Sequence, residues 1–146
     1  MAAMTNYVEN KLVDQLFRGQ AYTFPTTLYL ALYTTTPTAT AASGVEVTGG
    51  SYSRVAITGS LANWAGTQGA GTTVASTGTT GLTSNNTVLT YPAPTAAWGV
   101  VNGWGILDAA SAGNMVLFGA LTVPKTVNNG DAAPSFAAAA LSITFS

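Results

Sequence analysis

Histidine and cysteine are both absent from this chain of 146 residues. Without histidine, no side chain has an unperturbed pKa near neutrality, and without cysteine there is no thiolate nucleophile, disulfide or zinc-thiolate site. These absences remove most of the groups that enzymes use for catalysis. We therefore expect no enzymatic activity, no catalytic residue, no metal site and no cofactor.

Charge is also scarce, since Lys and Arg number four, Asp and Glu five, and charged residues make up 6% of the chain. A soluble protein usually carries charge at about a quarter of its residues. The basic residues Lys11, Arg18, Arg54 and Lys125 are too few and too scattered to neutralise a phosphate backbone, so we expect no nucleic-acid partner. Thr, Ser, Gly, Ala and Asn must cover the surface instead. Such a surface loses little hydration free energy on burial, which suits a protein that packs against other proteins.

Long hydrophobic runs are missing as well. Charged residues interrupt segment 1–17, which lacks the apolar centre of a secretory signal. The most apolar later stretch, 96–110, contains Asn102 and Asp108 and is shorter than a membrane-spanning helix. We expect no membrane partner. The length predicts a single domain over residues 1–146.

The N-terminal arm, residues 1–20, contains the one clear helical pattern, over 7–18. An apolar stripe follows the helical repeat at Val8, Leu12 and Leu16. Asn6 and Glu9 have the spacing of a capping box, and Gly19 has the place of a left-handed terminator. Two interpretations remain open: the helix packs on its own sheet, or it is an arm that docks on a neighbouring subunit.

From residue 21 onward the pattern has a period of two. Residues 28–33 alternate leucines with Tyr29, Ala31 and Tyr33, which predicts a strand with two apolar faces. Further strands are predicted at 52–58, 72–76, 87–91, 100–107, 115–122 and 141–145, with weaker ones at 45–47 and 60–64. The fold class is therefore mainly β: an antiparallel β-sandwich or jelly roll of about eight strands with one N-terminal α-helix.

Two segments resemble ligand-binding loops without completing them. The Gly/Thr-rich loop 65–81 contains Gly66, Gly69 and Gly71, but no Lys-Ser/Thr pair follows, so we predict a surface loop. Residues 128–131 resemble part of a calcium loop but lack its downstream acidic ligands, and Asn-Gly predicts a turn.

Carboxylates and aromatic rings are the remaining candidates for chemistry. The acidic residues are Glu9, Asp14, Glu46, Asp108 and Asp131, and no local spacing joins two of them as an acid and base pair. The aromatic set Tyr52, Trp64, Tyr91, Trp98 and Trp104 has the material for a sugar-binding face. Packing in a core or an interface is the preferred interpretation of these rings.

Residues 98–122, Trp-Gly-Val-Val-Asn-Gly-Trp-Gly-Ile-Leu-Asp-Ala-Ala through Leu-Phe-Gly-Ala-Leu-Thr, resemble a β-hairpin unit of small structural proteins of tailed bacteriophages. Other segments follow the order of the same proteins: 6–12, 29–37, 49–55, 124–131 and 136–141. The resemblance implies a virion component made in the cytoplasm of the bacterial host. Such proteins are labelled either tail-fibre proteins or capsid cement (decoration) proteins.

The chain lacks the coiled-coil heptads and β-helix repeats that are typical of tail fibres. This favours a capsid cement protein on the capsid exterior, which binds across subunits of the major capsid protein. The alternatives are a small tail or tail-fibre-associated protein and a carbohydrate-binding adhesion module.

Identical chains usually form closed oligomers, so we expect a homo-dimer or homo-trimer. The candidate interface residues are Tyr7, Tyr29, Tyr33 and Arg54. The Arg54 guanidinium would bridge to a carboxylate of a partner, the alternative being an ion pair within its own chain.

Overall fold

The computed structural model describes residues 2–41 and 43–145, and this part of the chain forms one α-helix and ten β-strands. The helix is α1 (Asn6–Phe17). The strands are β1 (Ala2–Met4), β2 (Thr27–Thr35), β3 (Val45–Glu46), β4 (Val55–Thr58), β5 (Leu82–Ser84), β6 (Leu89–Thr90), β7 (Gly99–Leu107), β8 (Met115–Val127), β9 (Ser135–Phe136) and β10 (Ser142–Thr144). The predicted mainly β class with an N-terminal helix is confirmed.

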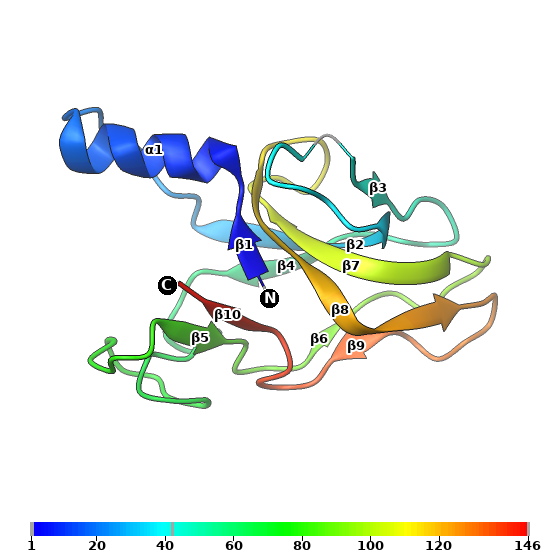
Figure 1. Cartoon of the computed structure of the whole chain (residues 1–146). Coiled ribbons are helices and arrows are strands. Elements are labelled where there is room, and N and C mark those ends of the chain that lie inside the picture. Colours follow the sequence, from blue (N-terminus) through cyan, green and yellow to red (C-terminus); the bar gives the residue numbers. More distant parts are fainter. Residues whose placement is uncertain (1, 42, 146) are drawn as a thin grey trace.

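The largest sheet has the strand order β1-β8-β7-β2-β3, and every pairing in it is antiparallel. One edge of β2 pairs with β7 (Figure 1). The other edge pairs with β4 along its first half, 27–30, and with β3 along its second half. Strands β2, β7 and β8 therefore form the centre of the molecule, and the shorter strands complete its edges.

Two smaller pairs, β5 with β10 and β6 with β9, form a second layer below the large sheet in Figure 1. The main core lies between the layers and includes Leu30, Leu32, Ile106, Leu117, Leu141 and Ile143. On the opposite face of the sheet, Ala31 and Tyr33 pack with Leu107 and Met115 in a second cluster. The predicted two-faced strand is therefore confirmed, and the layers make an antiparallel β-sandwich.

Helix α1 begins one residue earlier than predicted, with Thr5 rather than Asn6 at the N-cap position. The Thr5 hydroxyl makes no cap; instead it donates to the carbonyl oxygen of Met115 at 2.5 Å, which ties the helix start to β8. The predicted capping box of Asn6 and Glu9 is therefore wrong, because Asn6 already lies inside the helix and Thr5 at the N-cap position makes no side-chain cap. Gly19 follows the helix with a φ of 66°, as its place in the sequence predicted.

Several strand predictions need correction. Residues 72–76 and 60–64 form no strand, since their backbone lies in turns and loops, and the second segment contributes only an isolated bridge from Trp64 to Asn85. The predicted strand 52–58 starts at Val55, because Tyr52 lies in a turn in which its N–H donates to Gly49. Strands β1, β5 and β9 were not predicted; each has two or three residues, too short for a period to be visible.

The hairpin predicted within 98–122 is present as β7 and β8, joined by the turn 108–114. Strand β8 runs five residues beyond the predicted end, to Val127. The turn predicted at 128–131 is also present: Gly130 has a φ of 77°, and the Asp131 carboxylate accepts the Asn128 N–H at 2.7 Å. Over the described ranges, no helix has the length and apolar character needed to cross a membrane.

Candidate protein interface

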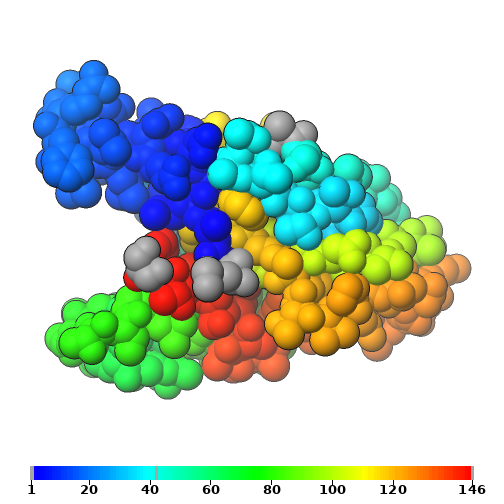
Figure 2. All heavy atoms as spheres, viewed as in Figure 1, coloured from blue at the N-terminus to red at the C-terminus, as the bar shows by residue number. Residues whose placement is uncertain are grey.

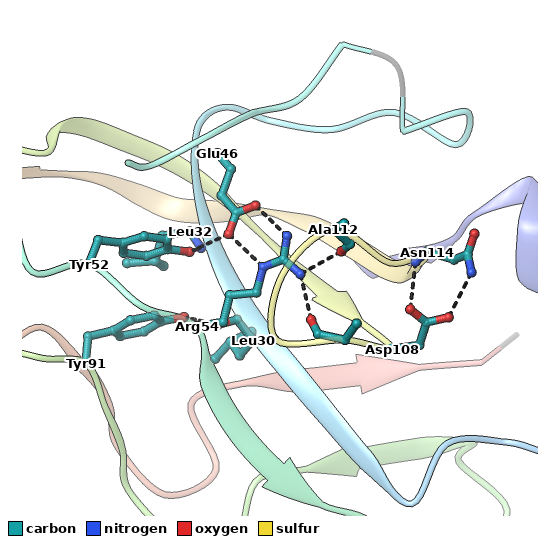
Figure 3. A network of polar contacts seen from close by, with 10 residues as sticks. Leu30, Leu32, Glu46, Tyr52, Arg54, Tyr91, Asp108, Ala112 and Asn114 are labelled. Atoms are coloured by element: carbon teal, nitrogen blue, oxygen red, sulfur yellow. Dashed lines mark hydrogen bonds and ion pairs between the residues drawn. The ribbon is translucent and has the colours of Figure 1, made fainter. Parts of the chain in front are cut away.

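Arg54 and Glu46 form a two-point ion pair between the residue before β4 and strand β3. Arg54 Nε donates to Glu46 Oε1 at 2.8 Å, and Nη2 donates to Oε2 at 2.7 Å. The exposed fraction is 8% for the Arg54 side chain and 23% for that of Glu46. Arg54 Nη1 also donates to the carbonyl oxygens of Ala109 and Ala112, at 2.6 and 2.9 Å (Figure 3). The hydrogen bonds to Glu46 raise the pKa of Arg54, because they favour the charged guanidinium. Arg54 therefore pairs with a carboxylate of its own chain.

Tyr52 extends this network into the middle of the large sheet. Its hydroxyl donates to Glu46 Oε1 at 3.1 Å and accepts the Leu32 N–H at 2.9 Å. The neighbouring Tyr91 hydroxyl donates to the carbonyl oxygen of Leu30 at 3.1 Å (Figure 3). Burial raises the pKa of both phenols, because the ionised form would lose its hydration. The two tyrosines therefore attach the loops 47–54 and 91–98 to β2.

The turn 108–114 presents its carbonyls to Arg54 because Asp108 fixes its shape. The Asp108 carboxylate accepts the Asn114 N–H at 2.7 Å and the Asn114 side-chain amide at 2.9 Å. Gly113 has a φ of 77°, and a Cβ there would lie 2.5 Å from Asp108 Oδ1, so only glycine fits. Arg54 thus joins β3, β4 and the β7–β8 turn. We call this group of Arg54, Glu46 and the carbonyls of Ala109 and Ala112 the polar clasp.

Most carboxylates in the described part of the chain are engaged internally. Glu46 holds Arg54, Asp14 holds Arg18 at 2.9 Å, and Asp108 and Asp131 accept backbone N–H groups in their own turns. No three acidic side chains among the described residues approach closely enough to hold a metal ion. The network therefore positions chain segments and presents no reactive pair.

Among the predicted interface residues, Tyr33 is not accessible. Its exposed fraction is 5%, because β2 turns the ring against Gly105 and Met115 on the second face of the sheet. Burial raises the pKa of Tyr33 to about 12. Tyr33 therefore packs the protein's own second cluster, which corrects its placement on an exposed contact face.

Tyr7 and Tyr29 are half-buried. The Tyr7 ring meets Tyr22 edge to face with centroids 6.2 Å apart, and Lys11 Nζ lies 5.7 Å from the Tyr7 centroid. Tyr29 lies on β2 opposite Ala56 and Leu107. Contact of either tyrosine with a partner stays a prediction.

Arg54 follows the alternative interpretation, an ion pair within its own chain. The residues that sequence reasoning missed are its partner Glu46 and Tyr52, which donates to the same carboxylate. The scarcity of charge was the available signal: with four basic and five acidic residues, an isolated arginine needs the nearest carboxylate, and Glu46 is nearest along the chain.

The proposed sugar-binding aromatic face is not formed. Tyr91, Trp98 and Trp104 are buried in the main core, and Tyr52 packs on Trp98 edge to face at 5.3 Å. The Trp98 indole N–H donates to the carbonyl oxygen of Gly50 at 3.0 Å. Tyr52 and Trp64 are partly buried against the same core. The five rings therefore pack in and beside the core and make no open face on which a sugar could stack.

Three of the large exposed apolar side chains lie on α1. In α1 only Val8 is buried, whereas Leu16 and Phe17 are 70% and 81% exposed. Figure 2 shows the helix projecting from the body of the molecule. Of the two interpretations, the projecting arm describes the position of this helix better than a helix packed along its own sheet.

In this β-sandwich the polar clasp holds segments of the chain together, and the large aromatic rings pack in the core. These are the features of a structural β-protein. The model of the podophage GP4 fiber I protein gp80 family matches residues 3–144, and the chain belongs to this family. It is therefore a structural protein of a bacteriophage virion, as the resemblance implied. A comparison with curated proteins found no match.

Proposed function

We propose that this chain is a small tail or tail-fibre-associated structural protein of the virion. The observation that carries the proposal is the match over residues 3–144 to a family described as a fiber protein. The projecting α1, with its exposed Leu16 and Phe17, also supports a role in assembly with other protein surfaces.

Immunogold labelling of intact virions tests this location. Antibodies raised against the folded chain should place gold at the tail, and quantitative gel densitometry should find far fewer copies than of the major capsid protein. Gold distributed over the capsid faces would contradict the proposal.

A second candidate is a capsid cement protein that binds across major capsid subunits on the capsid exterior. The supporting observation is the shortness of the elements in the described residues, in which the single helix has 12 residues and the longest strand has 13. A protein that binds the assembled lattice but not its separated subunits stabilises that lattice by linkage. Copy numbers comparable to those of the major capsid protein, together with a lower rupture temperature of capsids that lack the chain, would favour this candidate.

A further inference from the structure

Two unpaired apolar surfaces lie at opposite ends of the molecule. The first, the arm face, consists of Glu9, Val13, Leu16 and Phe17 on α1. These positions are i, i+4, i+7 and i+8, so they share one side of the helix. The three apolar members are exposed, with Phe17 the most exposed at 81%.

The second surface, the β8–β9 hollow, is a depression of about 190 Å³ between the large sheet and the second layer. Its lining includes Val101, Leu121, Val123, Lys125 and Phe136, and Val123 is 74% exposed. The hollow exists because β8 leaves its register here: Val101 pairs with Lys125, but Gly103 pairs with Ala120. The intervening residues bulge, which also suits Pro124, since proline has no N–H to donate to a ladder.

The charges on the two surfaces are complementary. Glu9 lies on the arm face and Lys125 lines the hollow. Neither side chain has a hydrogen-bonding or ionic partner in the ranges 2–41 and 43–145. The other ion pairs of the described chain, Arg18 with Asp14 and Arg54 with Glu46, are closed within it.

One molecule cannot join its own two surfaces. Figure 1 shows α1 at one end of the molecule and the C-terminal half of β8, with β9, at the other. We propose that the arm face of one copy docks into the β8–β9 hollow of a second copy, with Glu9 paired to Lys125. This inference holds for either location in the virion and does not depend on the proposed function.

Such a contact joins two different surfaces, so each copy donates one arm and accepts another, and the assembly closes when the rotation allows. A helix of 12 residues is about 18 Å long. One face of so short a helix buries less area than the roughly 800 Å² per partner of a standard interface. Each copy makes two such contacts, however, and the closed assembly compensates for the small area of each.

Sedimentation velocity on single and mixed variants tests the proposal. The wild-type chain should form a small closed oligomer. Phe17→Asp and Val123→Asp should each weaken association at least about a hundredfold. Mixing these two variants at high concentration should produce a one-to-one pair, because the intact arm of Val123→Asp fits the intact hollow of Phe17→Asp. This pair should be weaker than the wild-type assembly, since it has one contact and cannot close. A helix-to-helix dimer would instead be insensitive to Val123→Asp.

Charge reversal supplies a second measurement. Glu9→Lys and Lys125→Glu should each weaken association about three- to tenfold, and the double variant should recover it. Val74→Asp is the matched control, since Val74 is 60% exposed in the Gly/Thr-rich loop and should leave association unchanged. Near-UV circular dichroism verifies that each variant is folded. A monomeric wild type at the highest soluble concentration, or failure of the mixed variants to pair, would overturn the proposal.

Discussion

At the scale of single residues, the few charges of this protein serve mainly to hold it together. Arg54 joins three segments by four hydrogen bonds, and Asp108 and Asp131 fix turns. Removal of one partner of a buried ion pair leaves the other charge buried without a counter-charge, which destabilises the fold. The consequence is that charge substitutions should have very unequal effects.

Arg54→Ala should lower the free energy of unfolding by about 2–4 kcal/mol, since it removes two of the three hydrogen bonds to the Glu46 carboxylate and leaves the Ala109 and Ala112 carbonyls without their donor. Arg18→Ala, which removes the exposed pair with Asp14, is the matched control and should cost about 0.5 kcal/mol or less. Urea unfolding followed by circular dichroism measures both. Equal losses for the two variants would show that the clasp does not stabilise the fold.

Buried tyrosines should make the protein sensitive to alkali. Burial raises the pKa of Tyr33 to about 12 and raises that of Tyr91, against an ordinary value of about 10. Their neutral forms therefore contribute stability in full below about pH 10, and this contribution is lost as the pH rises toward 12. Urea unfolding at a series of pH values should show the free energy falling over this interval.

Tyr91→Phe is the control for this pH dependence. It removes one titrating group and should flatten the alkaline decline, while it costs about 1 kcal/mol at neutral pH for the lost bond to Leu30. A wild-type free energy of unfolding that stays constant through the alkaline interval would contradict the burial of these phenols.

At the scale of elements, the β7–β8 hairpin depends on glycines that let large rings lie flat on the sheet. Gly119 of β8 pairs with Trp104 of β7, and a Cβ on Gly119 would lie 2.7 Å from Trp104 Cζ2. The absence of a side chain there makes room for the indole, which is buried in the core.

Gly119→Ala should therefore destabilise the protein by about 1–3 kcal/mol, because either the indole or the strand must move. Gly59→Ala is the matched control: its Cβ would meet only the carbonyl oxygen of Thr26, at 3.5 Å, and we expect a change below about 1 kcal/mol. Thermal unfolding monitored by tryptophan fluorescence compares the two. Identical melting temperatures would show that the core accommodates the extra methyl group.

At the scale of the whole molecule, an exterior with little charge favours contacts that are driven by apolar burial. Net charge is −1, and the two ends that we propose to join are mostly apolar, with one ion pair between them. Association should thus depend weakly on salt, in contrast to complexes that are steered by many charges.

Raising the salt concentration from low to near-molar should weaken self-association by less than about tenfold, which sedimentation equilibrium can measure. Lys125→Glu should weaken association less at high salt, because screening reduces its repulsion from Glu9. Complete dissociation of the wild type by salt would indicate a contact based on charge rather than on the arm face and the hollow.

Long elements were predictable because their periodicity extends over many residues. The alternation at 28–33 and the hairpin strands 100–107 and 115–122 correspond to β2, β7 and β8. Thr72–Ser76, in contrast, has strand-like composition but forms part of a loop. The Thr72 hydroxyl donates to the carbonyl oxygens of Gly66 and Gly69 in the same loop. A short segment carries too little pattern to distinguish these outcomes.

Composition and local pattern were sufficient to determine the β class, the helix and the chain's preference for packing over chemistry, because these depend on residue types and on neighbours along the chain. The partner of Arg54, the burial of Tyr33 and the exposure of Leu16 and Phe17 depended on the folded structure. Each of these results from contacts or free space between segments far apart in sequence, such as Arg54 with the 108–114 turn. The low charge that first excluded catalysis thus became interpretable only when the fold showed which charges are paired internally, and that Glu9 and Lys125 stand without an ionic partner on two separate surfaces of the described chain.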